Sequence, residues 1–406
     1  MSVFKHLTAL PRTVWLIGLI SLLNDSASEM LYPLIPIYLS AVLMAGPKAL
    51  GLIEGVAEAT ASVLKLFSGV LMDRTRRAKP WMLVGYGLVG LGRPLIAFVH
   101  SWPWLMLIRF SDRVGKGLRT SPRDALLAAS VASNRRGLAF GLHRAMDNAG
   151  AVVGPLIAWA LLSMDIPLKE IFLWSAVPAL LCFLLTLMIK DHPAHLYGDL
   201  PRFRWKGEKL SREMKRYLLV IAIFSLGNAS NMFLLLRAGE LGVAQQDIPL
   251  LWAAVSAIPT LFSTPLAAWS DSIGRVRLLV AGYVAYGLVY LVLAFLGQAS
   301  LWLFGLYALY GLFLAATEGV EKAMVADLSA SDSRGAAYGW FNMVSGLCLL
   351  PASIVFGYLY QDISAEAAFG FSAACGFAAA ALLYGWRHGL LPESGEGTAA
   401  HQSHIG

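Results

Sequence analysis

The chain has 406 residues, of which 57% are hydrophobic and only 14% are charged, and its net charge is +7. A soluble domain carries about a quarter charged residues, so this chain has too little polar surface for a water-facing globule, and lipid must cover much of it. The three cysteines lie in separate apolar runs and show neither a disulfide framework nor a metal-ligand spacing: Cys182, Cys348 and Cys375. We therefore expect no metal and no cofactor.

Twelve segments are largely apolar over the roughly 20 residues that a helix needs to span a bilayer. In chain order they run over 14–42, 49–72, 80–101, 103–131, 137–162, 168–189, 214–237, 247–270, 277–298, 300–328, 336–361 and 365–387. A segment of this length in lipid satisfies its backbone hydrogen bonds as a helix, and none shows the alternation of a strand. The first run is too long for the core of a cleaved signal peptide, so we interpret it as a retained helix.

Lysine and arginine are distributed unevenly over the loops. If the N-terminus lies inside, the inner segments hold 20 of these residues and the outer segments hold three, Lys48, Lys169 and Arg237. Because positively charged loops stay on the cytoplasmic side, both termini are predicted to be cytoplasmic, in a multi-pass protein of the plasma (inner) membrane. The basic residues mark inner loops and form no groove, which argues against nucleic acid as a partner.

The chain divides into two similar halves. We expect a six-helix bundle over 1–190, a cytoplasmic linker over 191–213, a second six-helix bundle over 214–390 and a disordered tail over 391–406. The first inner loop of each half carries an aspartate, and Asp73 and Asp271 are 198 residues apart. The Arg-Gly pairs that begin at Arg136 and Arg334 are separated by the same offset. Two landmarks at one offset indicate a duplication, and parallel six-helix repeats are typical of one transporter architecture.

The loop landmarks also carry a resemblance to the major facilitator superfamily. Its signature between helices 2 and 3, Gly-x-x-x-Asp-Arg-x-Gly-Arg-Arg/Lys, resembles the segment with Gly69, Asp73, Arg74 and Arg77, although Arg76 replaces the second glycine. The second copy keeps Asp271 and Arg275 but has Ala267 for the first glycine. The resemblance implies a gate in which Asp73 contacts the N-terminus of helix 11. The alternative is a solvated inner loop, which explains the arginines but not the repeated aspartate.

Two further matches lie within helices. Arg109 followed by Gly115 is similar to the arginine-glycine pattern of the family's helix 4. Gly150, Gly154 and Pro155 resemble the motif of the antiporter branch, and the resemblance therefore implies antiport. Plain packing is the alternative, because glycines four residues apart allow helices to approach closely and a proline bends the helix.

Charged residues inside spanning segments are costly, and they usually face a cavity or a partner. Segment 103–131 carries a stripe at the i, i+3, i+4 and i+7 spacing of one helical face. We expect its cations to bind an anionic or zwitterionic substrate, namely Arg113, Lys116 and Arg119. The resembling fold lines its central cavity with helices 1, 4, 7 and 10, which adds Asn228, Asn231 and Glu318. Proton coupling is expected at Asp25, Glu29 and Asp147. Alternatively, these charges are ion pairs that lock helices 1, 2, 4 and 5 together.

We therefore expect an all-α membrane protein that transports a small organic solute by alternating access and is not an enzyme. Proton-coupled antiport, as in efflux, is the first hypothesis. A proton-coupled symporter or exchanger that takes up an organic anion is the alternative, and the cationic stripe supports it nearly as well. Sodium remains open as the coupling ion. A membrane enzyme or sensor is disfavoured because no paired-carboxylate motif such as DDxxD and no histidine cluster is present. The expected partners are the solute, protons and the lipid bilayer, with the protein acting as a monomer.

Overall fold

The computed structural model of the chain describes residues 10–75, 77–132, 135–191, 210–298, 302–329 and 334–387, and these residues contain helices but no strand. The side chains at 66, 69–74, 334–336 and 387 lie outside the description. Most of the expected linker, 191–213, and all of the expected tail, 391–406, also lie outside the described residues.

Long helices follow one another from end to end of the described chain. In the first half they are α2 (Arg12–Leu31), α3 (Leu34–Ala41), α4 (Pro47–Thr75), α5 (Ala78–Leu95) with the short turn η1 (Ile96–Phe98), α6 (Trp102–Ala129), α7 (Arg136–Ser163), α8 (Leu168–Trp174) and α9 (Ala176–Met188). In the second half they are α10 (Arg212–Gly227), α11 (Met232–Glu240), η4 (Gln245–Asp247), α12 (Ile248–Ile273), α13 (Arg275–Phe295), α14 (Trp302–Asp327), α15 (Arg334–Tyr358), η5 (Leu359–Ile363) and α16 (Ala365–Arg387).

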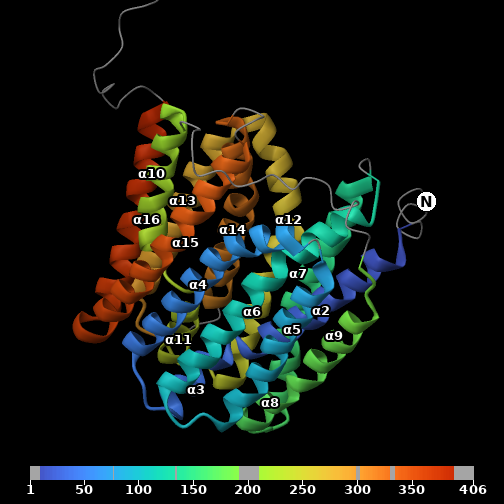
Figure 1. Ribbon diagram of the computed structural model, residues 1–406. Helices are drawn as coiled ribbons and strands as arrows, with labels where there is room; N and C mark the ends of the chain where they lie inside the picture. The colour runs from blue at the N-terminus through green and yellow to red at the C-terminus, as the bar shows by residue number, and fades with distance from the viewer. Residues whose placement is uncertain are drawn as a thin grey trace, which may run out of the picture.

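These helices make up the twelve expected spanning segments. Within the described residues, ten are long and apolar enough to cross a membrane, when α2 with α3, α8 with α9, and α10 with α11 are each taken as one. The two others, α4 and α6, have the length but carry many charged side chains. Both are packed between other helices. In the first half, α6 lies against α4 and α5, and α4 also packs against α15 of the second half (Figure 1). The predicted fold class is confirmed.

Two spanning segments are broken at equivalent places in the halves. The first bends between α2 and α3, where Pro33 has no N–H to continue the hydrogen-bond ladder. The seventh breaks between α10 and α11, where Asn228 leaves helical geometry with φ −92° and ψ 73°. Broken helices of this kind expose backbone groups in the middle of a membrane protein, where binding regions are found.

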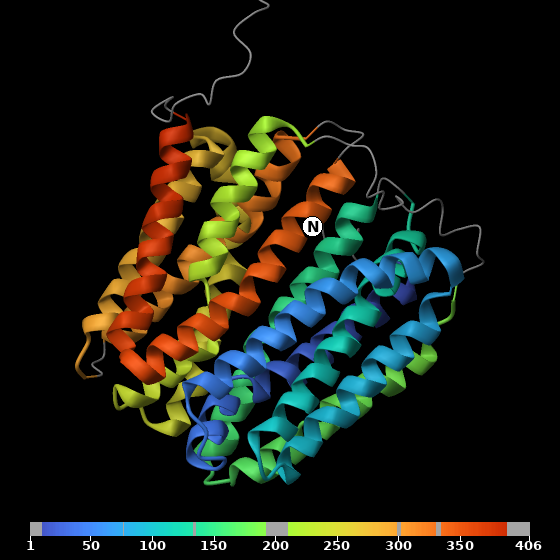
Figure 2. The same ribbon diagram turned by 60° about the vertical axis from the view of Figure 1, so that its left-hand side comes forward.

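The helices form two bundles, which meet more closely at one end than at the other. We call the end where α2 begins and α16 ends the terminus side, and the opposite end, with α3, α8 and α11, the far side (Figure 1). Between the bundles, α4 packs along α15, α7 along α12, and α3 against α11. Figure 2 shows α4 and α15 diverging from the far side toward the terminus side.

Glycines allow the close approach on the far side. A side chain at Gly51 or Gly55 of α4 would collide with α15, at the carbonyl of Ser353 and at Leu350 respectively. Lys48 adds an ion pair to Asp362 at 2.5 Å. Backbone contact without intervening side chains is the packing that holds helices together in lipid, so the far side is the closed end in this structure.

Candidate functional site

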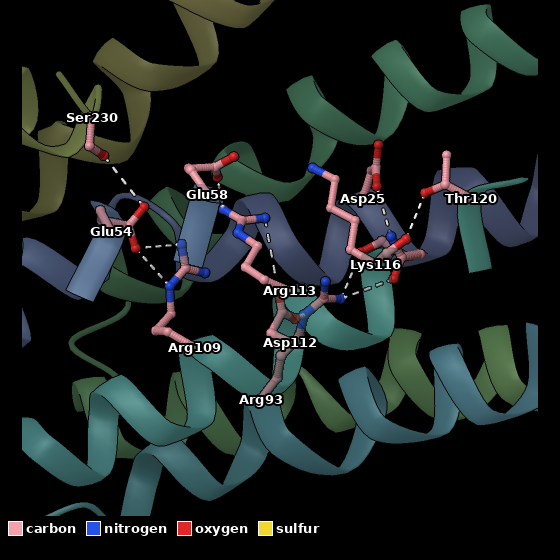
Figure 3. Close-up of polar contacts among 11 residues, drawn as sticks. Asp25, Glu54, Glu58, Arg93, Arg109, Asp112, Arg113, Lys116, Thr120 and Ser230 are labelled. Atoms are coloured by element: carbon pink, nitrogen blue, oxygen red, sulfur yellow. Dashed lines mark hydrogen bonds and ion pairs between the residues drawn. The ribbon is translucent and has the colours of Figure 1, made fainter. Parts of the chain in front are cut away.

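The charged stripe of α6 faces the other helices of its own bundle, and most of its members are paired there (Figure 3). Arg109 binds Glu54 of α4 through Nε at 2.9 Å and through Nη2 at 2.7 Å. Arg113 binds Glu58, also of α4, at 2.7 Å. Both arginine side chains are 6% exposed. In the absence of water, such pairing is what makes a buried guanidinium tolerable.

The acid of the stripe is paired in the same way. Asp112 accepts a hydrogen bond from Arg93 of α5 at 3.0 Å, and Arg93 also donates to the backbone oxygen of Asn24 at 2.9 Å. Asp112 lies 3.8 Å from Arg113 as well. The stripe therefore ties α2, α4, α5 and α6 together. The ion-pair alternative expected the first, second, fourth and fifth spanning helices, so these contacts involve the third, α5, in place of the fifth, α7. Arg93 was not predicted, although a charge within segment 80–101 was the signal that could have found it.

Lys116 differs from the arginines on either side of it. Its ammonium group forms no ion pair and no hydrogen bond within the described part of the chain, where only its backbone oxygen is bound, by Thr120 at 2.6 Å. Figure 3 shows its side chain extending between Glu58 and Asp25. Among the predicted substrate-binding cations, Arg113 has an ion pair, whereas Lys116 and Arg119 have none within the described residues.

Arg119 lies inside the N-terminal bundle. Its guanidinium stands over the ring of Tyr86 with 4.5 Å to the ring centroid, and its Cβ touches the position where Gly85 of α5 would carry a side chain. The side chain is 4% exposed, and its Nε and Nη1 have no hydrogen-bond partner among the described residues. Packing against α5 holds Arg119 within this bundle rather than against the C-terminal one.

The three expected proton-coupling carboxylates fall into a pair and a single group. The carboxyl groups of Asp25 of α2 and Asp147 of α7 lie beside each other, and Asp25 accepts a hydrogen bond from Asn24 at 2.8 Å. Two adjacent carboxyl groups can share a hydrogen bond only when one of them carries a proton, because only then is a donor present. The third, Glu29, lies apart from this pair.

Glu29 contacts the opposite bundle. Its Oε2 accepts a hydrogen bond from Nε1 of Trp252 of α12 at 2.8 Å, and the indole stacks on Tyr32 with the ring centroids 4.9 Å apart. A second polar contact between the bundles joins Ser230, in the break between α10 and α11, to Glu54 at 3.4 Å. The sequence carries no signal for either contact, because both depend on how the two halves pack.

The predicted residues of the C-terminal half are spread over several contacts. Asn231 accepts a hydrogen bond from the Tyr310 hydroxyl at 2.5 Å, whereas Oδ1 of Asn228 is buried without a partner among the described residues. Glu318 of α14 pairs across the bundles with Arg144 of α7 at 2.9 Å, and both side chains are about half exposed. Arg113, Asn231 and Glu318 thus each have a partner within the protein. Unpaired polar atoms remain, among the described residues, on Lys116, Arg119 and Asn228 and at Nε of Arg113.

The glycine motif of α7 brings this helix into backbone contact with α2. A side chain at Gly150 would begin 2.5 Å from the carbonyl oxygen of Leu22, and one at Gly154 would begin 2.5 Å from that of Ser26. Pro155 follows inside the helix. The close approach places Asp147 beside Asp25. Packing by these glycines is therefore a structural fact, and their antiport role stays a prediction.

Of the predicted gating residues, those of the second copy are described in full. Asp271 and Arg275 form an ion pair at 3.1 Å across the turn at Gly274, whose φ of 93° favours glycine. Arg275 also pairs with Asp327 of α14. In the first copy Arg77 is exposed. The side chains of Gly69, Asp73 and Arg74 lie outside the described residues, so the contact expected for Asp73 stays a prediction.

Within the described ranges, no group of three histidine, cysteine, aspartate or glutamate side chains is arranged to hold a metal ion. The site contains an adjacent pair of carboxyl groups, an ammonium group without an ion pair in the described residues, and polar contacts between the bundles. Groups of this kind can bind a proton and a charged solute, and the contacts of Glu29, Glu54 and Glu318 join the two halves of the molecule.

Comparison with known proteins fits this geometry. Residues 15–237 and 217–404 match the family model described as Major Facilitator Superfamily. An uncharacterized MFS-type transporter of Methanocaldococcus jannaschii is 36% identical over 368 residues, which cover 89% of this chain and 91% of the relative. Multidrug resistance protein MdtH of Photorhabdus laumondii is 26% identical over 328 residues, covering 78% of this chain and 79% of MdtH.

Solved structures show the same fold at lower identity. The nucleoside transporter NupG superposes with a TM-score of 0.74 at 15% identity, covering 91% of this chain and 100% of NupG. A peptide transporter, POT, superposes with a TM-score of 0.78 at 13% identity, covering 96% of this chain and 98% of the other. From its helices, its repeat and its relatives, the chain belongs to the major facilitator superfamily.

Proposed function

We propose that this transporter exports a small organic solute in exchange for protons, by alternating access. The observation that carries the proposal is the adjacent carboxyl pair of Asp25 and Asp147, which the close approach of α2 and α7 brings together. A proton held between two carboxyl groups is bound reversibly, because its loss leaves two negative charges side by side. A conformational change that exposes this pair to one side of the membrane and then to the other would carry the proton across.

Two further observations support export. Gly150, Gly154 and Pro155 resemble the motif of the antiporter branch, and the two glycines contact the backbone of α2. The 26% identical relative is named a multidrug resistance protein, which suggests efflux of organic compounds. In this proposal the far side faces outward and the terminus side faces the cytoplasm, in agreement with the 20 to three distribution of basic residues. Protease accessibility of a C-terminal tag in right-side-out cells tests this orientation.

One observation favours a second function, the uptake of an organic anion with protons. The ammonium of Lys116 has no partner within the described chain, and a negatively charged solute would neutralise it. Arg113 is less suited to this role, because its charge is already matched by Glu58. In this alternative the same carboxyl pair moves the proton, but in the same direction as the solute.

The test uses the full-length protein in liposomes loaded with a pH-sensitive dye, to which organic anions, cations and neutral drugs are added under an imposed pH gradient. We expect organic compounds that enter the liposomes to drive protons out of the lumen. The Asp25→Asn substitution should abolish this proton movement. Asp165→Asn, in the loop between α7 and α8, is the matched control and should behave as the wild type.

The outcomes separate the hypotheses. Proton movement with anions that disappears in Lys116→Met would support the uptake function. Proton movement with cations or neutral drugs that survives in Lys116→Met supports export. If Asp25→Asn leaves proton movement intact, the carboxyl pair is not the coupling site. If movement requires sodium and not a pH gradient, proton coupling itself is wrong.

A further inference from the structure

The C-terminal half contains a carboxyl group that the proposed function does not use. Glu321 lies in the terminus-side part of α14, and its Oε1 accepts a hydrogen bond from the Tyr283 hydroxyl of α13 at 2.8 Å. The hydroxyl of Tyr217 of α10 donates to the Glu321 backbone oxygen at 3.3 Å. Both tyrosines are 0% exposed. Glu321 is itself partly buried, and its carboxyl group contacts one of these buried tyrosines, Tyr283.

The groups that surround Glu321 include no cation bound to it within the described residues. On its own helix, Lys322 lies 3.9 Å from Glu318, and both side chains are half exposed. From α15, the Tyr338 hydroxyl donates to the Lys322 backbone oxygen at 3.0 Å. The acid that α12 contributes at this end, Asp271, is paired with Arg275. Around the Glu321 carboxyl itself, the polar partner is the neutral Tyr283.

This environment contrasts with that of the buried acids of the N-terminal half. Glu54 is 1% exposed and is held by two nitrogens of Arg109, and Asp112 is held by Arg93. An ionised carboxylate that is removed from water needs such a cation, and without one it takes up a proton instead. One neutral hydroxyl does not compensate a full negative charge, so the ionised form of Glu321 is poorly stabilised here.

We propose that Glu321 binds a proton in this far-side-closed conformation and forms a second proton site, in the half of the molecule opposite the Asp25–Asp147 pair. The proton sits on Oε2, the oxygen that Tyr283 leaves unoccupied, and it leaves to water on the terminus side with the carboxylate as the product. Assigning this proton to the transport cycle rests on the proposed proton-coupled function. The binding of the proton does not.

Infrared spectroscopy of the reconstituted full-length protein tests the binding, because a protonated carboxyl group has a carbonyl stretching band that a carboxylate lacks. We expect the wild-type band to lose part of its intensity in Glu321→Gln. Glu318→Gln, on the same helix, is the matched control and should retain the band, since Glu318 is exposed and paired with Arg144. An unchanged band in Glu321→Gln overturns the proposal.

A second variant keeps the test decisive if Glu321→Gln does not fold. Tyr283→Phe leaves the acid in place but removes its hydrogen-bond donor, so the carbonyl band of Glu321 should move to higher frequency. A band that neither moves nor changes in Tyr283→Phe contradicts the assignment.

Transport measurements then separate this inference from the proposed function. If Glu321→Gln loses its band intensity and the number of protons moved per solute also falls, Glu321 belongs to the coupling machinery. If the band is lost and the ratio is unchanged, the coupling role of Glu321 is wrong while proton-coupled transport stands. If the wild type moves no protons with any compound of the panel, the proposed function fails, whatever the infrared result.

Discussion

At the scale of single residues, the cations of α6 are of two physical kinds. Arg109 is buried, and its charge is matched by Glu54 through two hydrogen bonds. Lys116, further along the same helix, has an ammonium group without a partner in the described residues. The first kind holds helices together, and removing it leaves an opposite charge stranded. The second kind forms no ion pair within the described residues, and the uptake alternative assigns it to the solute.

Substitution should separate the two kinds. Arg109→Met leaves Glu54 buried without a cation, and breaking a buried pair in this way costs about 3–5 kcal/mol, so the melting temperature should fall sharply. Lys116→Met removes a cation that forms no ion pair within the described residues and should change the free energy of unfolding by less, about 0.5 kcal/mol. Thermal unfolding of the two purified variants in detergent measures the difference.

A double variant controls for the loss of side-chain volume. Adding Glu54→Gln to Arg109→Met removes the stranded charge and should recover part of the lost stability. Equal melting temperatures for Arg109→Met and Lys116→Met would show that the Arg109 ion pair is not structural.

At the scale of elements, apolar length and basic loops predict the helices well. Segment 137–162, for example, is observed as α7, Arg136–Ser163, because a bilayer fixes how long a spanning helix must be. The breaks were not predicted. An apolar run continues through Pro33 and through Asn228, so a count of apolar residues does not register the change in backbone geometry.

The sequence predicts which residues belong to the candidate site better than it predicts which residues they contact. Asp25 and Asp147 stand out as charges within apolar segments, and the glycines of α7 explain why they meet. The same reasoning places Glu29 with them, whereas Trp252 from the other half holds it. Contacts between the halves depend on their relative orientation, which no local pattern encodes.

The contact of α7 with α2 makes a testable prediction at this scale. In Gly154→Ala the new Cβ would lie 2.5 Å from the Ser26 oxygen and 2.7 Å from the Met30 nitrogen, so α2 and α7 must separate. We expect a lower melting temperature and loss of proton movement, because Asp147 moves away from Asp25. Gly141→Ala, on the same helix, is the control.

The control variant, Gly141→Ala, should be more stable than the wild type, whereas Gly154→Ala should be less stable. A side chain at Gly141 meets nothing within 4 Å, so alanine there should stabilise α7 by about 1 kcal/mol through its higher helix propensity and leave transport unchanged. If both variants retain wild-type proton movement, the close approach of the two helices is not needed for coupling.

At the scale of the whole molecule, the far side is closed by contacts that alternating access must break. The Lys48–Asp362 ion pair, the Glu29–Trp252 hydrogen bond and the glycine contacts of α4 all join the two bundles. The ion pair is about one third to one half exposed, so it contributes roughly 0–1 kcal/mol and can open readily. Contacts that open readily are compatible with alternating access, because the closed far side must open once in every transport cycle.

Locking these contacts should therefore stop transport. We would replace Cys182, Cys348 and Cys375 by alanine, introduce Lys48→Cys and Asp362→Cys, and join the two thiols with a short reagent that contains a reducible bond. The crosslinked protein is expected to lose proton movement with the active compounds of the panel, because the far side can no longer open. Reduction of the crosslink should restore it. The Lys48→Cys single variant, treated in the same way, should stay active. Full activity of the crosslinked protein would mean that α4 and α15 do not separate on the far side, and the alternating-access cycle proposed for these two bundles would have to pivot elsewhere.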